Sequence, residues 1–386
     1  MNFEFSEEEE AVRDLAGQIL GDSTSFDRTR EIEADPNGPG FDRELWAQLA
    51  ESNLIGLPLD EAFGGQGFGF LALCLMLEEA GRNLAPVPLV ESIVHAALPI
   101  QRFGSDALKK DLLPRVVSGD SVLTAAFFEV GAPTLARKTK TRVAAAVDGF
   151  TLSGKKICVP FASAAEKILV TASGEEGLGV FLISPDAACV SLERQETTAH
   201  EPQFVVKMEG TAVKGDDVVA VPGRGEEILD WLEPRAMTAL AAIAVGAAEE
   251  GLRQTAAYTS TRKQFGREIG SFQGVSLRAA DAYIDVEAMR STMWQAAWQI
   301  DAGRDARKAA LVARWWACMG GHRVSHTCQH LHGGIGADID YPIHRFFLRL
   351  KHVAMTLGGS NEELAALGLL IAEEARAGID PEAILS

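Results

Sequence analysis

The chain has 386 residues, and its 36 Lys and Arg stand against 54 Asp and Glu, which gives a formal net charge of −18. This charge argues against a nucleic-acid partner, because neutralising phosphates needs clustered basic side chains, and it also disfavours docking on an anionic membrane. Hydrophobic residues make up 47% of the chain, which is enough for a large core and argues against wholesale disorder.

The N-terminus reads MNFEFSEEEEAV, which is acidic where a secretory signal is basic and apolar. No apolar run is long enough to span a bilayer. The cysteines are odd in number and scattered, with no CxxC pair: Cys74, Cys158, Cys189, Cys318 and Cys328. We therefore expect a cytoplasmic protein with no disulfide framework and no membrane insertion.

Residues 1–120 are predicted to form an N-terminal helical domain. Ser6 and Glu9 have the spacing of a capping box ahead of an apolar periodic run. Residues 41–57 have leucines near helical spacing, and the glycine-rich segment 61–69 follows them. No GKS or GKT follows that segment, so the sequence favours a helix–helix connector over a phosphate loop.

Residues 121–222 change character and are predicted to form a middle β domain, a small barrel or sandwich. Short runs rich in β-branched residues alternate there with Gly, Asp and Ser. Residues 223–386 return to helical periodicity, with long helices expected over 272–300 and 304–330. The three segments predict an α+β multidomain chain that ends in a bundle of four or five helices.

Two segments carry residue types suited to chemistry. The run RKQFG at 262–266 lies between helical stretches, where Arg262 either binds a phosphate or forms a solvated helix end. His322, His326 and His330 share one helical face, which suggests either a zinc site or a polar surface. No acid stands between the first two as in HExxH, so the polar surface is favoured and no metal is expected.

Three C-terminal motifs resemble the acyl-CoA dehydrogenase family: RKQFGREIGSFQ, HLHGGIGADIDYPIHRFFLRLKH and GGSNEELAALG. The helix–strand–helix order extends the resemblance over essentially the whole chain. It implies the acyl-CoA dehydrogenase fold, with an N-terminal α-helical domain, a middle β-barrel and a C-terminal four-helix-type bundle. It also implies FAD as cofactor, an acyl-CoA thioester as substrate, and an electron-transfer flavoprotein as electron acceptor.

The resemblance assigns roles to individual residues. Arg262 matches the family arginine that binds the FAD pyrophosphate across a subunit interface, and Phe265 and Gln273 match its companions. Gly333 and Gly334 match the glycine pair that lets the adenosine half approach. His330 stands where the family usually has Gln, and a histidine still donates a hydrogen bond.

The position of the catalytic base departs from the family pattern. The family glutamate precedes the glycine of a Glu-Gly-Thr motif, and Leu357 stands at that position here. Some relatives place the glutamate on an earlier helix just before an arginine, but here Pro234 precedes Arg235. Glu233 is one residue further away, a shift of about 100° around a helix, so it is a weak substitute and is better read as a helix-cap or surface carboxylate.

The flavin-facing segments depart as well. The family Trp-x-Thr/Ser motif is replaced by Cys158-Val159-Pro160, which has neither a stacking aromatic ring nor a hydroxyl donor. The loop that usually reads GAGSD is reduced to Val130-Gly131-Ala132-Pro133.

These departures lead to the hypothesis that the chain is the non-catalytic subunit of a heteromeric acyl-CoA dehydrogenase, with a homologous catalytic subunit as partner in an α2β2 assembly. The sequence most resembles the β subunits of actinobacterial enzymes that act on steroid side chains, in segments such as FDRELW and DYPIHRFFL. Two alternatives remain. One is a self-sufficient homotetrameric dehydrogenase with a relocated base, and the other is a flavin-free acyl-CoA-binding or scaffold protein.

Overall fold

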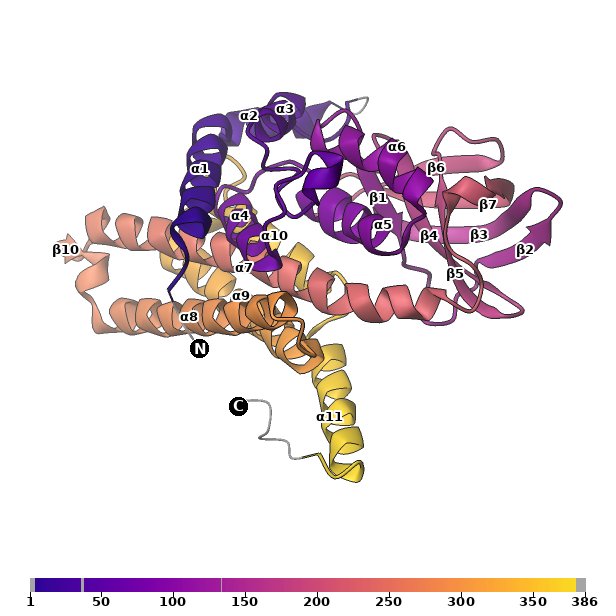
Figure 1. The fold of residues 1–386 in the computed structure, drawn as a ribbon. Helices are drawn as coiled ribbons and strands as arrows, with labels where there is room; N and C mark the ends of the chain where they lie inside the picture. Colours follow the sequence, from indigo (N-terminus) through magenta and orange to yellow (C-terminus); the bar gives the residue numbers. More distant parts are fainter. Residues whose placement is uncertain (1–3, 36–37, 133, 380–386) are drawn as a thin grey trace.

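The computed structural model describes residues 4–35, 38–132 and 134–379. Three layers follow one another along the chain: N-terminal helices, a central β domain and a C-terminal set of long helices (Figure 1). No helix among these residues is both long and apolar enough to cross a bilayer.

The N-terminal layer is helical, as the periodicity predicted. Its main elements are α1 (Glu7–Ser23), α2 (Phe26–Ala34), α3 (Arg43–Glu51), η1 (Glu61–Phe63), α4 (Phe70–Arg82), η2 (Val90–Ala97), α5 (Leu98–Phe103) and α6 (Asp106–Val117). The predicted capping box is present at α1, where Ser6 accepts from the backbone of Glu9 and the Glu9 carboxylate accepts from the backbone of Ser6. One feature was not predicted, because η2 is a π-helix.

The glycine-rich segment 61–69 is a connector, as expected. The backbone N–H groups of residues 65–68 all donate to carbonyls within residues 56–60. A Cβ built on Gly65 would lie 2.1 Å from the carbonyl oxygen of Leu59. The backbone N–H groups of residues 65–68 are therefore already hydrogen-bonded, and Gly65 packs directly against the backbone. The segment offers no free N–H groups there to bind a phosphate.

The central domain is an eight-stranded mixed sheet in the order β6-β7-β3-β2-β4-β5-β8, with β1 pairing in parallel with β4. The strands are β1 (Leu123–Ala126), β2 (Arg142–Ala146), β3 (Gly149–Pro160), β4 (Lys167–Gly174), β5 (Gly177–Ile183), β6 (Val190–Gln195), β7 (Gln203–Lys214) and β8 (Val218–Ala220). One strand, β6, was not predicted. It lies at one end of the sheet order, and only two of its six residues, Val190 and Leu192, are apolar, which is a weak strand signal.

Over the described residues, the C-terminal layer contains five α-helices, within the predicted four or five, together with two short 3₁₀ helices and a short hairpin. They are α7 (Gly225–Thr261), β9 (Lys263–Gln264), β10 (Arg267–Glu268), η4 (Ile269–Ser271), α8 (Gln273–Asp301), α9 (Arg307–His332), η5 (Gly333–Ala337), α10 (Ile343–Met355) and α11 (Ser360–Arg376). Gly333 and Gly334 directly follow α9, and Gly358 and Gly359 directly precede α11. The fold is therefore the expected one, an α-helical domain, a β domain and a helical bundle.

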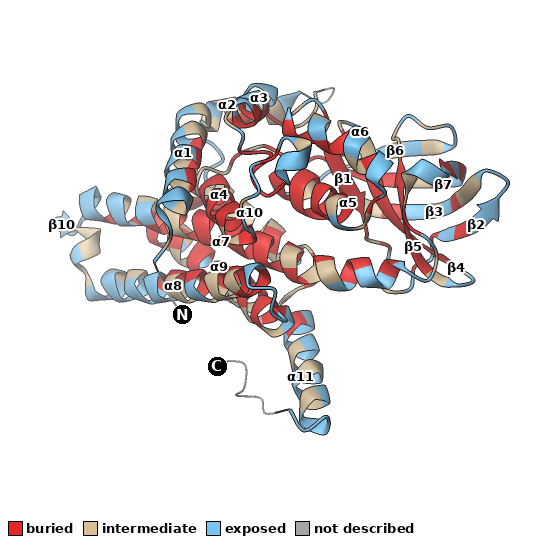
Figure 2. Cartoon of the chain, viewed as in Figure 1, coloured by how far each residue is buried: buried red, intermediate tan, exposed pale blue. Residues whose placement is uncertain are grey.

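One hydrophobic core joins the N-terminal helices to α7–α10, and a second fills the β domain. In Figure 2 the buried residues concentrate where α4 crosses α7 and where β1 meets the helices. A Cβ on Gly246 would lie 1.8 Å from the carbonyl oxygen of Glu78, and one on Gly81 would lie 2.1 Å from that of Ile243. These two glycines allow α4 and α7 to cross with their backbones in contact.

Candidate functional site

The residues matched to the cofactor site gather at one end of the helical bundle. Arg262 caps α7, the β9–β10 hairpin follows with Phe265 at its turn, and Gln273 begins α8. Phe265 has a φ of +54° and a ring that is 93% exposed. A non-glycine residue in left-handed backbone and a large apolar side chain in full contact with solvent are each uncommon, and Phe265 combines the two.

The glycine pair lies at the same end of the bundle. Tyr258, one turn before Arg262 on α7, stacks on His332 with ring centroids 4.4 Å apart, and Gly333 directly follows that histidine. A Cβ at Gly333 or Gly334 would meet nothing within 4 Å, so the glycines form an open surface. The structure thus brings both groups of matched residues to one exposed region.

These matched residues form the region called here the cofactor surface: Arg262, Phe265, Gln273, His330, Gly333 and Gly334. All six are exposed. Among the described residues, the guanidinium of Arg262 has no hydrogen-bond or ion-pair partner. A free guanidinium beside glycines without side chains suits a flat ligand with anionic groups, so these residues fit the pyrophosphate and adenosine parts of FAD.

His332 supports the glycine turn from below. It is buried between Tyr258 and Tyr341, and its Nδ1 lies 2.8 Å from the carbonyl oxygen of Cys328. Burial lowers the pKa of His332, so the ring is neutral at physiological pH. The sequence did not single out His332. Its role is visible only in the folded chain, where it ends α9 and packs beside the glycine turn.

The base position holds no titratable group. Leu357 is 3% exposed and has a φ of +61°, in the turn between α10 and α11. Buried Arg314 fixes this turn by donating to the carbonyl oxygens of Val353 and Thr356. Leucine at this position can neither accept nor donate a proton.

The weak substitute for the base, Glu233, is already engaged in an ion pair. Its Oε2 accepts from Arg137 at 2.8 Å, and both Glu233 and Leu357 line a separate cavity of about 240 Å³. An arginine already occupies this carboxylate, which fits the surface interpretation given by the sequence.

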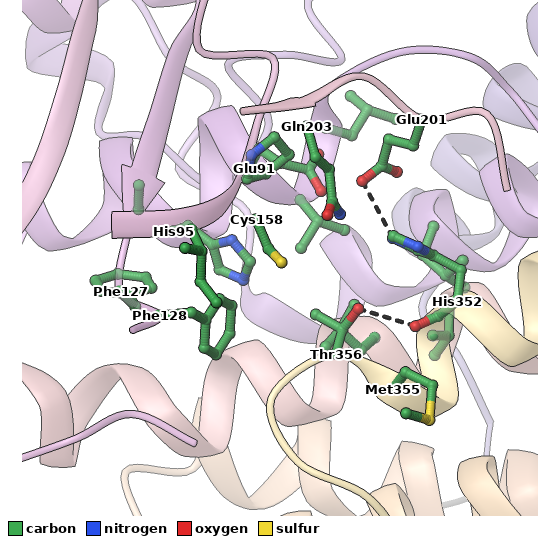
Figure 3. A pocket seen from close by; sticks show the side chains of 18 of the residues that line it. Glu91, His95, Phe127, Phe128, Cys158, Glu201, Gln203, His352, Met355 and Thr356 are labelled. Carbon is green, nitrogen blue, oxygen red and sulfur yellow. Dashed lines mark hydrogen bonds and ion pairs between the residues drawn. The ribbon is translucent and has the colours of Figure 1, made fainter. Parts of the chain in front are cut away.

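A cavity of about 540 Å³ lies where the N-terminal helices, the β domain, α7 and α10 meet, and we call it the interdomain cavity (Figure 3). The residues that line it include Cys158, Pro160, Gly131 and Ala132, which belong to the segments that correspond to the family's flavin-facing motifs. Pro133 lies outside the described residues. The cavity therefore stands where a catalytic relative is expected to hold its reacting groups.

A break in the β3–β7 pairing brings Cys158 to the cavity. The register between these strands shifts between Lys156 and Val159, and Cys158 in this bulge has a φ of +52°. Its backbone N–H, which leaves the strand ladder, donates to Gln195 at 2.8 Å. Bulges re-aim side chains, and this one places a thiol where the family has an aromatic residue.

A buried ion pair holds the cavity wall. Glu129 accepts from Lys156 at 2.8 Å and from the backbone and hydroxyl of Thr141. Although burial opposes ionisation, these hydrogen bonds lower the pKa of Glu129 to about 2. The carboxylate is thus fully engaged, and it fixes the loop after β1 against β3.

The polar side of the cavity was not predicted. Glu201 accepts from Arg349 at 2.9 Å and pairs with His352 at 3.1 Å, as Figure 3 shows for the histidine. Although burial opposes ionisation, His352 and Arg349 hold the pKa of Glu201 well below its usual range. Across the cavity, Glu91 and His95 lie four residues apart on η2. In the sequence, the signal that could have identified this polar site was the four-residue spacing of Glu91 and His95 inside an otherwise apolar helix.

The histidine face of α9 behaves as a polar surface. The rings of His322 and His326 are 4.4 Å apart, His322 contacts Lys351, and His330 belongs to the cofactor surface. Over the part of the chain that the structure describes, no group of three His, Cys, Asp or Glu side chains is arranged to hold a metal ion.

Comparison with known proteins gives a consistent result. Residues 6–120 match the model of the acyl-CoA dehydrogenase N-terminal domain, and residues 234–369 match that of the acyl-CoA dehydrogenase C-terminal domain. The chain is 36% identical to acyl-CoA dehydrogenase FadE27 of Mycobacterium tuberculosis, over 94% of this chain and 98% of that protein.

Two solved structures are similar throughout. A variant of the steroid ACAD Tcur3481-Tcur3483 shares 43% identity and a TM-score of 0.89, covering 96% of this chain and 99% of that one. The ChsE4-ChsE5 complex from Mycobacterium tuberculosis shares 35% identity and a TM-score of 0.90, covering 97% and 99%.

Proposed function

Because the chain belongs to the acyl-CoA dehydrogenase family, an oxidoreductase family that acts on CH–CH bonds, we propose that it is the non-catalytic subunit of a heteromeric member. In this proposal a homologous chain supplies the base and binds most of the FAD. This chain contributes the cofactor surface to that FAD. Its contribution is to bind and orient the anionic half of the cofactor.

The observation that carries the proposal is the absence of a usable base in the described cavity. Leu357 occupies the family position, and Glu233 is paired with Arg137 elsewhere. Of the carboxyl groups that line the interdomain cavity, Glu129 and Glu201 are held by cations. Burial and the charge of Glu201 raise the pKa of the remaining one, Glu91, to about 8, so it is protonated at neutral pH. FAD supplies the hydride acceptor in this family's reaction, but a proton acceptor is also needed.

The distance along α7 supports a contribution to a different chain. Ile243 lines the interdomain cavity, and Arg262 follows 19 residues later at the far end of the same helix. At 1.5 Å per residue, the two are separated by about 28 Å along the helix axis. The cofactor surface therefore lies well away from this chain's own cavity and is open to a neighbouring subunit.

The relatives support the assembly and the substrate class. One similar solved structure is the ChsE4-ChsE5 complex, and the other is described as a steroid ACAD. We extend both features to this chain and propose an α2β2 assembly that dehydrogenates a steroid side-chain CoA ester. An electron-transfer flavoprotein is the proposed acceptor and the reducing cytoplasm the proposed location. All five cysteines are free, which agrees with that location.

Replacing Arg262 tests the shared cofactor. In the purified complex with the catalytic homologue, Arg262→Ala should weaken FAD binding by about tenfold or more, because a charge-assisted hydrogen bond is worth roughly 1.5–3 kcal/mol. Flavin absorbance per chain pair after gel filtration measures this loss. Arg43→Ala, which removes an exposed arginine of α3, is the matched control and should retain full flavin.

Glu233→Gln separates the heteromeric subunit from a self-sufficient enzyme. Activity of the complex should not change, since Arg137 already occupies this carboxylate. A loss of activity with retained flavin would identify Glu233 as a relocated base. Full flavin in the Arg262→Ala complex would instead favour the flavin-free scaffold.

A further inference from the structure

We propose that the interdomain cavity is a ligand site of this chain in its own right, which binds a neutral, mainly apolar molecule through a hydroxyl or ketone oxygen at His95 and Glu91 and does not oxidise it. The site goes beyond the proposed function, because it lies apart from the cofactor surface and needs no turnover. Four observations carry the inference.

The first is the shape and lining of the cavity. Its volume of about 540 Å³ falls within the range of roughly 300–1,000 Å³ of small-molecule sites. Apolar side chains from each neighbouring layer form most of the wall, among them Val90, Phe127, Phe128, Leu240 and Ile243. A few polar groups converge on this apolar space, which is the usual composition of a specific pocket.

The second is an unpartnered buried nitrogen. His95 is only 6% exposed, and its Nε2 has no hydrogen-bond partner in the part of the chain that the structure describes. The ring is packed edge-on against Phe127 with centroids 6.0 Å apart, and it lines the cavity (Figure 3). A buried polar atom without a partner costs roughly 1–3 kcal/mol, so a ligand oxygen at this point recovers a hydrogen bond that the chain itself leaves unmade.

The third is the helix that carries the two side chains. Glu91 and His95 stand on the π-helix η2, a rare geometry that is concentrated at functional sites. The helix is anchored, because Ser92 accepts from the backbone of Leu123 in β1 at 3.1 Å. The carboxyl of Glu91 forms no hydrogen bond or ion pair with another described residue. Both polar groups are thus held in place and free to bind.

The fourth is the charge around the site. Burial lowers the pKa of His95 to about 4, and Glu91 is protonated at neutral pH, so both groups are uncharged. Glu201, the nearby carboxylate, is paired with Arg349 and His352. A carboxylic acid in the ligand would meet an ionised glutamate, whereas an alcohol both donates and accepts, and a ketone accepts from Glu91. The surroundings therefore select a neutral oxygen.

The carboxyl groups that line this cavity complete the case, because Glu129 and Glu201 are paired with cations and Glu91 is protonated, so an occupant finds no free carboxylate to take an α-proton. The test uses the purified heteromeric complex with three probes that share one tetracyclic skeleton: androstanol, androstanone and androstane. Calorimetric titration measures the affinity and the number of sites per chain pair. We expect androstanol and androstanone to bind at least tenfold more tightly than androstane.

Variants of this chain assign the site. His95→Phe should fill the polar corner and reduce the number of androstanol sites per chain pair by one, which separates this cavity from any in the partner. His95→Gln keeps a hydrogen-bonding group and should stay within about threefold of the parent affinity. His326→Phe changes an exposed histidine of α9 and is the matched control, with no effect expected.

Two results would overturn the inference: equal affinity for androstane and androstanol, or an unchanged site number in His95→Phe. Flavin content measured on the same samples keeps this test separate from the proposed function. Arg262→Ala should lose flavin and keep the androstanol site, and His95→Phe should do the reverse. If Arg262→Ala loses flavin but His95→Phe keeps the androstanol site, the ligand site is refuted and the proposed function stands. If His95→Phe loses the site but Arg262→Ala keeps flavin, the proposed function is refuted and the ligand site stands.

Discussion

At the scale of single residues, the chain has groups that suit a cofactor's anionic half, and the described residues of its cavity offer no free carboxylate as a base. Arg262 is exposed and has no side-chain partner among the described residues, while Leu357 is buried where the family resemblance leads us to expect a glutamate. The carboxylates near the cavity are either paired, as Glu129 and Glu201 are, or protonated, as Glu91 is. Each of these states has a consequence for stability that can be measured.

Glu91 should make stability fall as pH rises. Its pKa is about 8 in the folded chain against 4.5 for an unperturbed glutamate, so unfolding releases a proton between these values and the free energy of unfolding decreases through this window. Glu91→Gln removes the effect, and its advantage over the parent should grow to about 1 kcal/mol or more near pH 8. Thermal unfolding at several pH values measures this. An advantage that does not change with pH, or one shared by the exposed control Glu373→Gln, would contradict it.

The Glu129–Lys156 pair should be strongly coupled. Both side chains are almost fully buried, so Glu129→Gln leaves an uncompensated ammonium and should cost about 3–5 kcal/mol. Adding Lys156→Met removes that charge and should recover more than half of the loss. Urea unfolding of the two single variants and the double variant gives the coupling energy. A double variant no more stable than Glu129→Gln would show that the pair is not the source of the loss.

At the scale of elements, the close crossing of α4 and α7 positions the helical wall of the interdomain cavity. Gly246→Ala should push the two backbones apart and destabilise the chain by about 1–3 kcal/mol, because its Cβ would overlap the carbonyl oxygen of Glu78. Gly368→Ala on α11 meets open space and should be neutral or slightly stabilising. The midpoints of urea unfolding compare them, and equal midpoints would refute the packing argument.

Helix α11 has an apolar face that is exposed in the described part of the chain. One face packs on α9 through Leu367, Leu370 and the Lys308–Glu374 pair, and the helix extends away from the body in Figure 1. Leu364, Gly368 and Ile371 recur at helical spacing on the solvent side, where all three are exposed.

Charging this face should disrupt assembly and spare the fold. Leu364→Lys with Ile371→Lys should lower the native mass of the co-purified complex, because two ammonium groups would be buried at an interface. Unfolding of the chain alone should change by less than about 0.5 kcal/mol, since the positions are exposed there. Native mass spectrometry decides, and an unchanged mass would remove α11 from the interface.

The sequence predicted the elements that carry strong periodicity, including the capping box at Ser6, the central β domain and both long helices of the bundle. It missed β6, which has only two apolar residues in six, and the π geometry of η2, which no propensity encodes. The polar side of the cavity was also missed, because Glu91, Glu201 and Arg349 come from three distant segments. Only the folded chain brings such residues together, whereas motifs such as RKQFG are contiguous and can be read directly.

At the scale of the whole molecule, the interdomain cavity lies beside the middle of α7, at Leu240 and Ile243, and the cofactor surface lies at the C-terminal end of that helix. Under the proposed function, this chain contributes to another subunit's cofactor while its own cavity lacks a base. That proposal requires one flavin in each pair of unlike chains rather than one in every chain.

Flavin stoichiometry and native mass, measured on this chain expressed alone and then co-expressed with a catalytic homologue, test this claim most directly. The account predicts little flavin on the chain alone, and a heterotetramer with one FAD per chain pair after co-expression. One FAD on every copy of the chain expressed alone, bleached by an acyl-CoA, would contradict the account and make the chain a complete dehydrogenase.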